Sequence, residues 1–124
     1  NGGVQLDLMG QENGESAGSR QLSGTGGQLD FLEGAFRSKG GKGFICLNSS
    51  RLDKTGTRKS NIVPFIPGGS TVSAPRSLIE YVATEYGVVR LTGLSLGERA
   101  KAMISIAHPD FREELAQYAR EHFQ

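Results

Sequence analysis

The 124-residue sequence has little of several features that mark common classes of protein. Its single cysteine, Cys46, excludes a disulfide within the chain and is typical of a reducing cytosol. The longest run of uncharged apolar residues, Phe44–Leu47, is far too short to span a bilayer. Because 14 Lys and Arg balance 13 Asp and Glu, no excess charge favours nucleic acid or a membrane surface. We therefore expect a cytoplasmic protein that binds neither.

The sequence also has no conventional beginning. It starts at Asn1 instead of Met, and no basic-then-apolar leader opens it. The first residues enter a strand-like pattern at once, so we expect a chain cut from a longer polypeptide. Its length is enough for one domain with one hydrophobic core.

Glycine, by contrast, is abundant: the 18 glycines are about twice the usual ~7%. Most of them stand before residue 44. A flexible linker would show the same enrichment, but apolar pairs such as Leu6 with Leu8 and Leu29 with Phe31 stand between these glycines, and a solvated linker has no reason to keep them. We interpret the glycines as positions that need a positive φ or the close approach of a ligand.

The apolar pattern of the first half predicts strands around one helix. Alternation over Val4–Gly10 predicts a strand with one buried face, and the polar residues 11–21 predict a surface loop. Apolar residues at helical spacing predict a short helix at 28–37. The continuous run Phe44–Leu47 predicts a strand buried on both faces, in which Cys46 is an inert core residue.

The middle of the chain is predicted to form short elements joined by turns. In order, these are an exposed turn at 53–57, a strand at 62–66 that Pro64 confines to a sheet edge, an extended piece at 71–73, a turn or single helical turn at 75–79, a strand at 81–86 ended by Gly87, and an extended segment at 88–91.

Two helices are predicted to close the chain. Ser95 with Glu98 three residues later forms a capping box, and an apolar stripe runs from Leu96 to Ala107. Asp110 and Glu113 repeat the capping pattern before a second amphipathic helix. Strands and helices alternate only loosely, so the fold class is α/β or α+β with a mixed sheet.

The sharpest local motif is the glycine loop Ser23–Gly27, which opens the first helix. Successive glycine amides at a helix start form a cluster of donors that suits a phosphate or a developing oxyanion. The same spacing also fits a tight turn that needs only a positive φ. A Walker A loop is excluded because Gly43 follows Gly41-Lys42, and a dinucleotide fingerprint because Leu29 replaces its third glycine.

Other polar residues can be interpreted either as functional or as merely solvated or structural. Lys39 and Lys42, flanked by glycines, suit phosphates as mobile point charges, and they equally suit a solvated loop. Glu85 ends an apolar strand, where catalytic residues occur, but we expect it to pair with Arg76 or Arg90 and support a turn.

Nothing in the sequence predicts a metal site or a catalytic triad. We expect His108 to pack and hydrogen-bond at the helix junction, because no second His or Cys stands at metal-ligand spacing. No Ser/His/Asp constellation is apparent.

Several motifs follow one another in a recognisable order. They are residues 24–31, 34–35, 38–42, 61–64, 84–88, 91–95, 98–100 and 106–115. As a set they resemble the second domain of the acetyl-CoA hydrolase/4-hydroxybutyrate CoA-transferase family, and most resemble its butyryl-CoA:acetate and 4-hydroxybutyrate branches. The similarity runs from about Val4 to Leu115. Departures are mild: Asn61 and Thr92 stand where the family often has a basic residue, and Gly97 interrupts a helix start.

The resemblance implies a fold and a reaction. Residues 1–124 would be the C-terminal part of the second domain, a fragment of a CoA-transferase-type open mixed sheet with flanking helices, without its upstream portion and first domain. Family members move coenzyme A between an acyl-CoA and a carboxylic acid of the acetate, butyrate or 4-hydroxybutyrate class, through a glutamyl-CoA thioester. That glutamate lies upstream of every matching motif, so neither Glu33 nor Glu85 takes its role.

The resemblance also implies a binding site. Gly24, Gly26 and Gly27 would approach the thioester oxygen of coenzyme A, and Lys39 or Lys42 would contact the coenzyme, which is a substrate and not a permanently bound cofactor. The expected partners are an acyl-CoA, a short carboxylic acid, the missing N-terminal part and a second copy in a homo-oligomer. Two alternatives stay open: an acyl-CoA hydrolase on the same scaffold, and a free-standing anion- or nucleotide-binding module.

Overall fold

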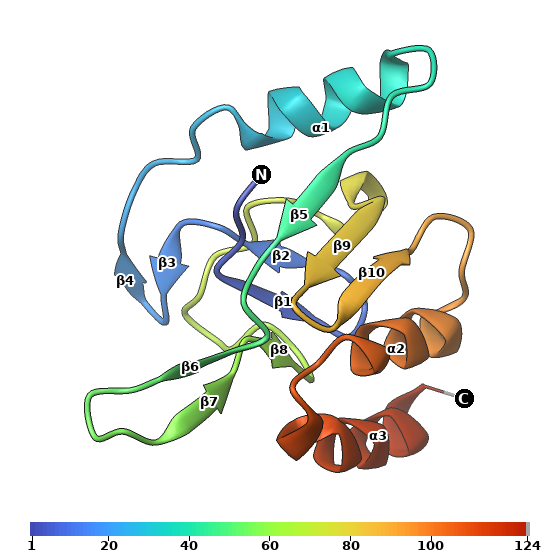
Figure 1. Ribbon diagram of the computed structural model, residues 1–124. Coiled ribbons are helices and arrows are strands. Elements are labelled where there is room, and N and C mark those ends of the chain that lie inside the picture. The colour runs from blue at the N-terminus through green and yellow to red at the C-terminus, as the bar shows by residue number, and fades with distance from the viewer. Residues whose placement is uncertain (124) are drawn as a thin grey trace.

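Two small mixed sheets form the centre of the computed structural model, which describes residues 1–123 (Figure 1). In the first sheet, β1 (Gln5–Asp7) pairs antiparallel with β2 (Glu12–Asn13) and parallel with β8 (Ile62–Val63). In the second, β9 (Tyr81–Thr84) pairs antiparallel with β10 (Gly87–Arg90) and parallel with β5 (Phe44–Cys46).

Two hairpins extend from these sheets. One is formed by β3 (Ser16–Ala17) with β4 (Arg20–Gln21), and the other by β6 (Ser50–Leu52) with β7 (Arg58–Ser60). The α/β class with open mixed sheets is confirmed, but the strands are divided between several sheets. Each strand has only two to four residues.

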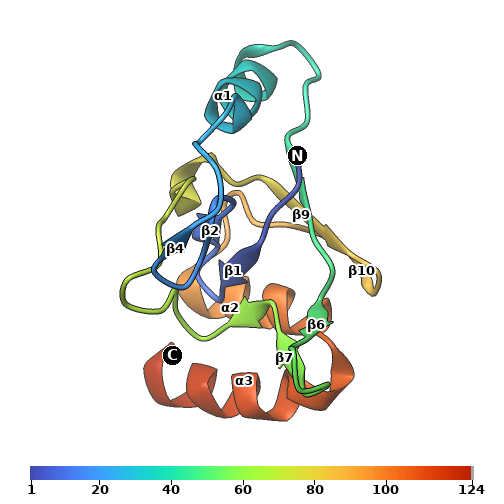
Figure 2. The same cartoon turned by 90° about the vertical axis from the view of Figure 1, so that its left-hand side faces the viewer.

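Within residues 1–123, the α-helices lie at opposite ends of the structure. α1 (Gln28–Arg37) stands at one end, and α2 (Leu96–Ser105) and α3 (Pro109–His122) pack together at the other, as Figure 2 shows. The helix at 28–37 was predicted with these bounds. The short turn predicted at 75–79 is the 3₁₀ helix η1 (Arg76–Leu78).

The helix caps follow the sequence in one case and not in the other. The capping box is confirmed: Glu98 N donates to Ser95 Oγ at 3.2 Å, and Ser95 N donates to Glu98 Oε2 at 2.7 Å. The predicted cap at Asp110 is wrong, because Pro109 occupies the first position of α3 and His108 caps it, with Nδ1 accepting from Asp110 N at 3.1 Å.

The hydrophobic core lies between the sheets and the C-terminal helices. Its fully buried members include Leu6, Ile45, Val82, Leu91 and Met103. Each such side chain contributes roughly 1.5–3 kcal/mol on burial. The second sheet thus has one covered face.

The other face of that sheet is open, which overturns one prediction. Along Phe44–Leu47 burial alternates: Ile45 is buried, whereas Phe44 and Cys46 are exposed. Phe44 stacks on Tyr81 of β9, with 4.8 Å between ring centroids. The strand is therefore not buried on both faces, and Cys46 is not a core residue.

The segment 11–21, predicted as a surface loop, is also different. It contains β2, β3 and β4, and it buries the polar residues Glu12, Asn13, Glu15 and Ser16. Asn13 Nδ2, for example, donates to the carbonyl oxygen and the hydroxyl of Ser16, both at 3.0 Å. Hydrogen bonds take the place of apolar burial here, so the hydropathy pattern carried no signal. Within the described residues, no helix is both long and apolar enough to cross a membrane.

Candidate functional site

The glycine loop Ser23–Gly27 connects β4 to the start of α1. The positive φ expected there is found at Gly26, at 59°, and not at Gly27, whose φ is −95°. Gly27 is the capping position of α1, and no side chain accepts a hydrogen bond from the first turn of the helix. A Cβ atom built on Gly24 or Gly26 would meet no atom within 4 Å. The loop therefore presents bare backbone to open space.

An open depression of ≈ 510 Å³ lies beside this loop. It is lined by the loop itself together with Asn1, Gly2, Gly14 and Gln28. None of these residues is basic, and the acidic Asp30 stands in the first turn of α1. Apart from the amino terminus of Asn1, which donates to Phe44 O, the donors that this depression can offer to a ligand are thus neutral ones, chiefly backbone amides.

Glu15 holds the beginning of the loop in place. Its backbone carbonyl accepts from Leu22 N at 2.8 Å and from Ser23 N at 3.3 Å. Its carboxylate accepts from Ser73 Oγ at 2.5 Å and from Gln21 Nε2 at 2.8 Å. The hydrogen bonds from Ser73 and then Gln21 lower the pKa of Glu15 below its usual value, so this carboxylate is ionised at neutral pH.

Glu12 lies behind the end of the loop. Its Oε1 accepts from Gln28 Nε2 at 3.1 Å, and its buried Oε2 has no hydrogen-bond partner among the described residues. Burial, reinforced by the negative charge of Glu15, raises the pKa of Glu12 to about 7 against the pull of Gln28. Room for this carboxyl group exists because Gly3 and Gly14 have no side chains: a Cβ on Gly14 would lie 2.6 Å from Glu12 Oε1.

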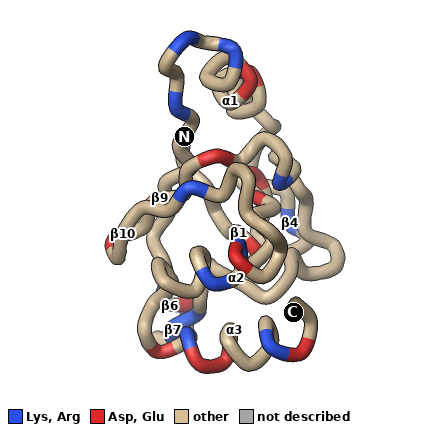
Figure 3. The backbone as a smooth tube through the Cα atoms, turned by 90° about the vertical axis from the view of Figure 1, so that its right-hand side faces the viewer, with Lys and Arg blue, Asp and Glu red and all other residues tan. Residues whose placement is uncertain are grey.

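The two lysines lie at the far end of α1 from the glycine loop. α1 has 10 residues, which at 1.5 Å per residue separates its ends by about 15 Å. Lys39 and Lys42 are both exposed on the turn that follows the helix. This turn stands at the end of the molecule remote from α2 and α3 (Figure 3). The structure thus does not bring the predicted lysines and glycines together.

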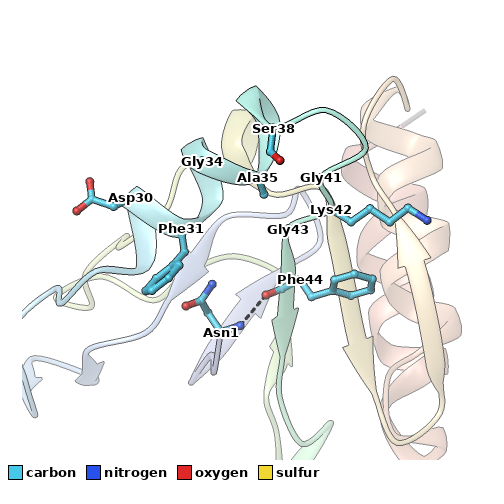
Figure 4. A pocket seen from close by; sticks show the side chains of 10 residues that line it. All are labelled: Asn1, Asp30, Phe31, Gly34, Ala35, Ser38, Gly41, Lys42, Gly43 and Phe44. Carbon is cyan, nitrogen blue, oxygen red and sulfur yellow. Dashed lines mark hydrogen bonds between the residues drawn. The ribbon is translucent and has the colours of Figure 1, made fainter.

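A second depression, of ≈ 560 Å³, lies along α1 between these two places. Asn1, Phe31 and Phe44 line it, with Lys42 at its rim (Figure 4). In this view the Lys42 side chain extends away from Asn1 and Phe31. Asn1 also lines the depression at the glycine loop, so the two hollows are neighbours.

The remaining candidates have structural roles. Glu85 Oε1 accepts from Ser49 N at 2.8 Å, so it supports a turn as expected, but through a backbone amide and not through an arginine. Burial pushes the pKa of Glu85 upward, but hydrogen bonds from backbone amides, that of Ser49 first, act together with the charge of His108 to outweigh it, so that the pKa lies below its usual value. Arg90 pairs instead with Glu80, at 3.2 Å.

His108 packs at the helix junction, as predicted. Besides capping α3, its ring meets those of Tyr86 and Phe111 edge-on, each at 5.9 Å between centroids. Within residues 1–123 no group of three His, Cys, Asp or Glu side chains is placed to hold a metal ion.

Comparison with known proteins identifies the class to which this geometry belongs. Residues 1–119 match the sequence profile described as acetyl-CoA hydrolase/transferase C-terminal domain. The chain belongs to this family, and the resemblance inferred from the motifs is confirmed.

Individual members of the family are similar to this chain over nearly its whole length. The chain is 50% identical over 115 residues to the butyryl-CoA:acetate CoA-transferase of Anaerostipes caccae, covering 93% of this chain and 26% of the relative. It is 48% identical over 121 residues to the 4-hydroxybutyrate coenzyme A transferase of Clostridium kluyveri, covering 97% and 27%. The crystal structure of RipA from Yersinia pestis superposes with a TM-score of 0.84 at 46% identity, over 98% of this chain and 26% of that one. The chain thus spans about a quarter of the length of these proteins.

Proposed function

We propose that this chain is the C-terminal part of the second domain of a CoA-transferase. The enzyme would move coenzyme A between an acyl-CoA and a carboxylic acid of the acetate, butyrate or 4-hydroxybutyrate class. The supporting observation is the identity of 48–50% to transferases of these names over nearly the whole chain. The glutamate that forms the glutamyl-CoA thioester would lie in the upstream polypeptide, so the part described here binds and orients the substrate.

In this proposal the glycine loop binds the thioester oxygen. Gly24, Gly26 and Gly27 are exposed, and no basic side chain lines the depression beside them to balance a phosphate. A single oxygen that gains negative charge during acyl transfer needs only aimed N–H donors, which an uncapped helix start supplies. The neutral lining therefore favours the oxyanion over the phosphate.

The lysines would serve the other end of the coenzyme. Coenzyme A carries its thioester and its phosphates at opposite ends of a long pantetheine arm, and about 15 Å separates the two ends of α1. With the thioester at the glycine loop, Lys39 or Lys42 would meet the phosphate end as a screened point charge. Coenzyme A would bind as a substrate that leaves, not as a resident cofactor.

A hydrolase on the same scaffold is the second candidate. The family whose profile matches includes acetyl-CoA hydrolases as well as transferases, and in a hydrolase water would replace the second acid as acceptor. A free-standing binding module is disfavoured, because the chain corresponds to about a quarter of the relatives that it matches. The expected partners are the upstream polypeptide and a second copy of the protein, and the single unpaired cysteine fits the cytoplasm.

The mass of the full-length protein after incubation with an acyl-CoA tests the proposal. We expect a covalent adduct whose added mass is that of coenzyme A less one water, located in a peptide upstream of Asn1 and formed as the acyl group leaves as free acid. Acetate should discharge this adduct as acetyl-CoA. The 124-residue chain alone should form no adduct and show no exchange. An adduct on this chain would place the nucleophile here and overturn the assignment. Continued release of free acid without an acceptor acid, beyond the one equivalent that adduct formation liberates, would identify a hydrolase.

A further inference from the structure

The first three residues form an additional strand position at the edge of the second sheet. Gly2 and Cys46 form a parallel β-bridge. Three backbone hydrogen bonds hold it: the amino nitrogen of Asn1 donates to Phe44 O at 2.8 Å, Cys46 N donates to Asn1 O at 2.8 Å, and Gly3 N donates to Cys46 O at 2.9 Å. The spatial order is therefore β10, β9, β5 and then residues 1–3.

The backbone N–H and C=O groups of β5 point alternately toward β9 and toward residues 1–3. Tyr81 N donates to Gly43 O and Leu47 N donates to Ala83 O, both at 3.1 Å, so these groups of the β5 strand face β9. The groups of Phe44 and Cys46 face residues 1–3. By the same alternation, the amide of Phe44 and the carbonyl of Lys42 also point to this edge. They lie where a residue preceding Asn1 in the chain would pair.

This next position lies in the second depression, along α1. Phe31 stands on its helix side and is 69% exposed, and Phe44 stands on its sheet side. Gly43, directly before β5, lets the chain lie close to α1, because a Cβ atom at this position would lie 3.2 Å from Leu32. Figure 4 shows Asn1 between the Phe31 ring and the backbone of β5 at Phe44, whose own ring points away from Asn1. The hollow thus combines an open sheet edge with an exposed aromatic ring.

We propose that this depression is a docking groove for an extended polypeptide segment that lengthens the edge of the sheet in parallel with β5. In a protein of the relatives' length, the occupant is the stretch that leads into Asn1. The amino nitrogen of Asn1 already makes a β-sheet hydrogen bond, to Phe44 O. A peptide bond at that nitrogen would therefore direct the preceding residue along Gly43 and Lys42 toward α1. Its second residue before Asn1 pairs with the Phe44 amide and the Lys42 carbonyl, as in strand addition to an open edge.

The proposal separates the two depressions by function. The groove at Phe31 is filled by protein, and the thioester end of the coenzyme is left with the depression at the glycine loop. To reach Lys39 or Lys42, the rest of the coenzyme would pass outside the filled groove. It rests on the chain being part of a longer protein, and not on which acid or acyl-CoA the enzyme uses.

Hydrogen exchange at the Phe44 amide tests the proposal directly. In the full-length protein we expect this amide to exchange more slowly than in the 124-residue chain, by a factor on the order of ten or more, because it gains a backbone partner. Equal exchange in both proteins would overturn the proposal. So would protection of the short chain that rises with protein concentration, which would indicate a second copy, or protection by added coenzyme A, which would indicate a ligand.

A matched pair of variants tests the aromatic wall. Phe31→Asp should lower the melting temperature of the full-length protein, because the ring is covered there. Leu52→Asp, at a 60% exposed position on the β6–β7 hairpin, is the control and should leave it unchanged. In the 124-residue chain both variants should be neutral. A neutral Phe31→Asp in the full-length protein would show that no segment covers this side chain.

Discussion

The two ends of the molecule use their helices in different ways. At one end, α2 and α3 pack on each other and α2 packs on β10 of the second sheet, and Met103 and Leu115 are buried. At the other, α1 buries Leu32 but leaves Phe31 and Phe36 exposed. Both C-terminal helices thus contribute buried side chains to the hydrophobic core. The α1 end keeps apolar rings, uncovered glycine amides and basic residues on its surface, so it is suited to binding.

Truncating one apolar side chain at each end should give the largest contrast. Met103→Ala should lower the free energy of unfolding by about 2–5 kcal/mol, because it leaves a cavity in the core. Phe36→Ala on α1 should cost about 1 kcal/mol or less, since that side chain is 43% exposed. Urea unfolding of the 124-residue chain provides both values. A loss for Phe36→Ala as large as that for Met103→Ala would mean that the Phe36 side chain is buried like a core residue.

The buried carboxyl group behind the glycine loop should make stability depend on pH. The pKa of Glu12 is raised from 4.5 to about 7 in the folded chain, so its contribution is fully present below pH 4.5 and is lost as the pH rises to 7. Glu12→Gln should remove this dependence and stabilise the protein by roughly 2 kcal/mol at pH 8, with little effect at pH 4.

Glu15 is the matched control for that experiment. Its pKa is lowered, so its contribution is present above pH 4.5 and is lost as the pH falls further. Glu15→Gln should therefore destabilise the chain at pH 8, the opposite sign to Glu12→Gln. Thermal melts of both variants from pH 4 to pH 8 measure the difference, and curves of the same sign would refute the assigned ionisation states.

The lysines at the far end of α1 should give the smallest effect. Lys39→Ala and Lys42→Ala should each weaken coenzyme A binding to the full-length enzyme by about 1 kcal/mol or less, because both side chains are exposed and screened. The loss should shrink further as salt is added. Titration calorimetry at two salt concentrations provides the numbers, and a variant with unchanged affinity would exclude that lysine from the site.

Apolar periodicity and capping residues predicted much of the fold. They placed α1, the capping box at Ser95 and the turn at η1, because those elements depend on contacts that are local in sequence. These local patterns failed to predict burial where it depends on contacts between residues distant in sequence. Burial on one face of β5 depends on what covers the sheet, and the buried Glu12 and Glu15 are polar residues held by hydrogen bonds to distant partners.

The candidate site was predictable only in part. The spacing of the glycines indicated the loop and its positive φ, which is found at Gly26. The roles of Glu12 and Gln28 behind the loop carried no signal, since residues 11–21 have the composition of a surface loop. The resemblance assigned the glycines and the lysines to the same ligand, coenzyme A, but gave no distance between them. That distance follows from the length of α1, which the sequence did predict.

The most direct test of the account compares two glycines with the same backbone conformation. Gly26 and Gly18 both have φ of 59°, and a Cβ on either meets no atom within 4 Å. Valine at either position should therefore cost similar strain, roughly 1–3 kcal/mol. If the glycine loop binds the thioester oxygen, Gly26→Val in the full-length enzyme should reduce kcat by about 10²-fold, while Gly18→Val, in the β3–β4 turn, should leave it nearly unchanged. Equal turnover of the two correctly folded variants would show that the loop is only a turn.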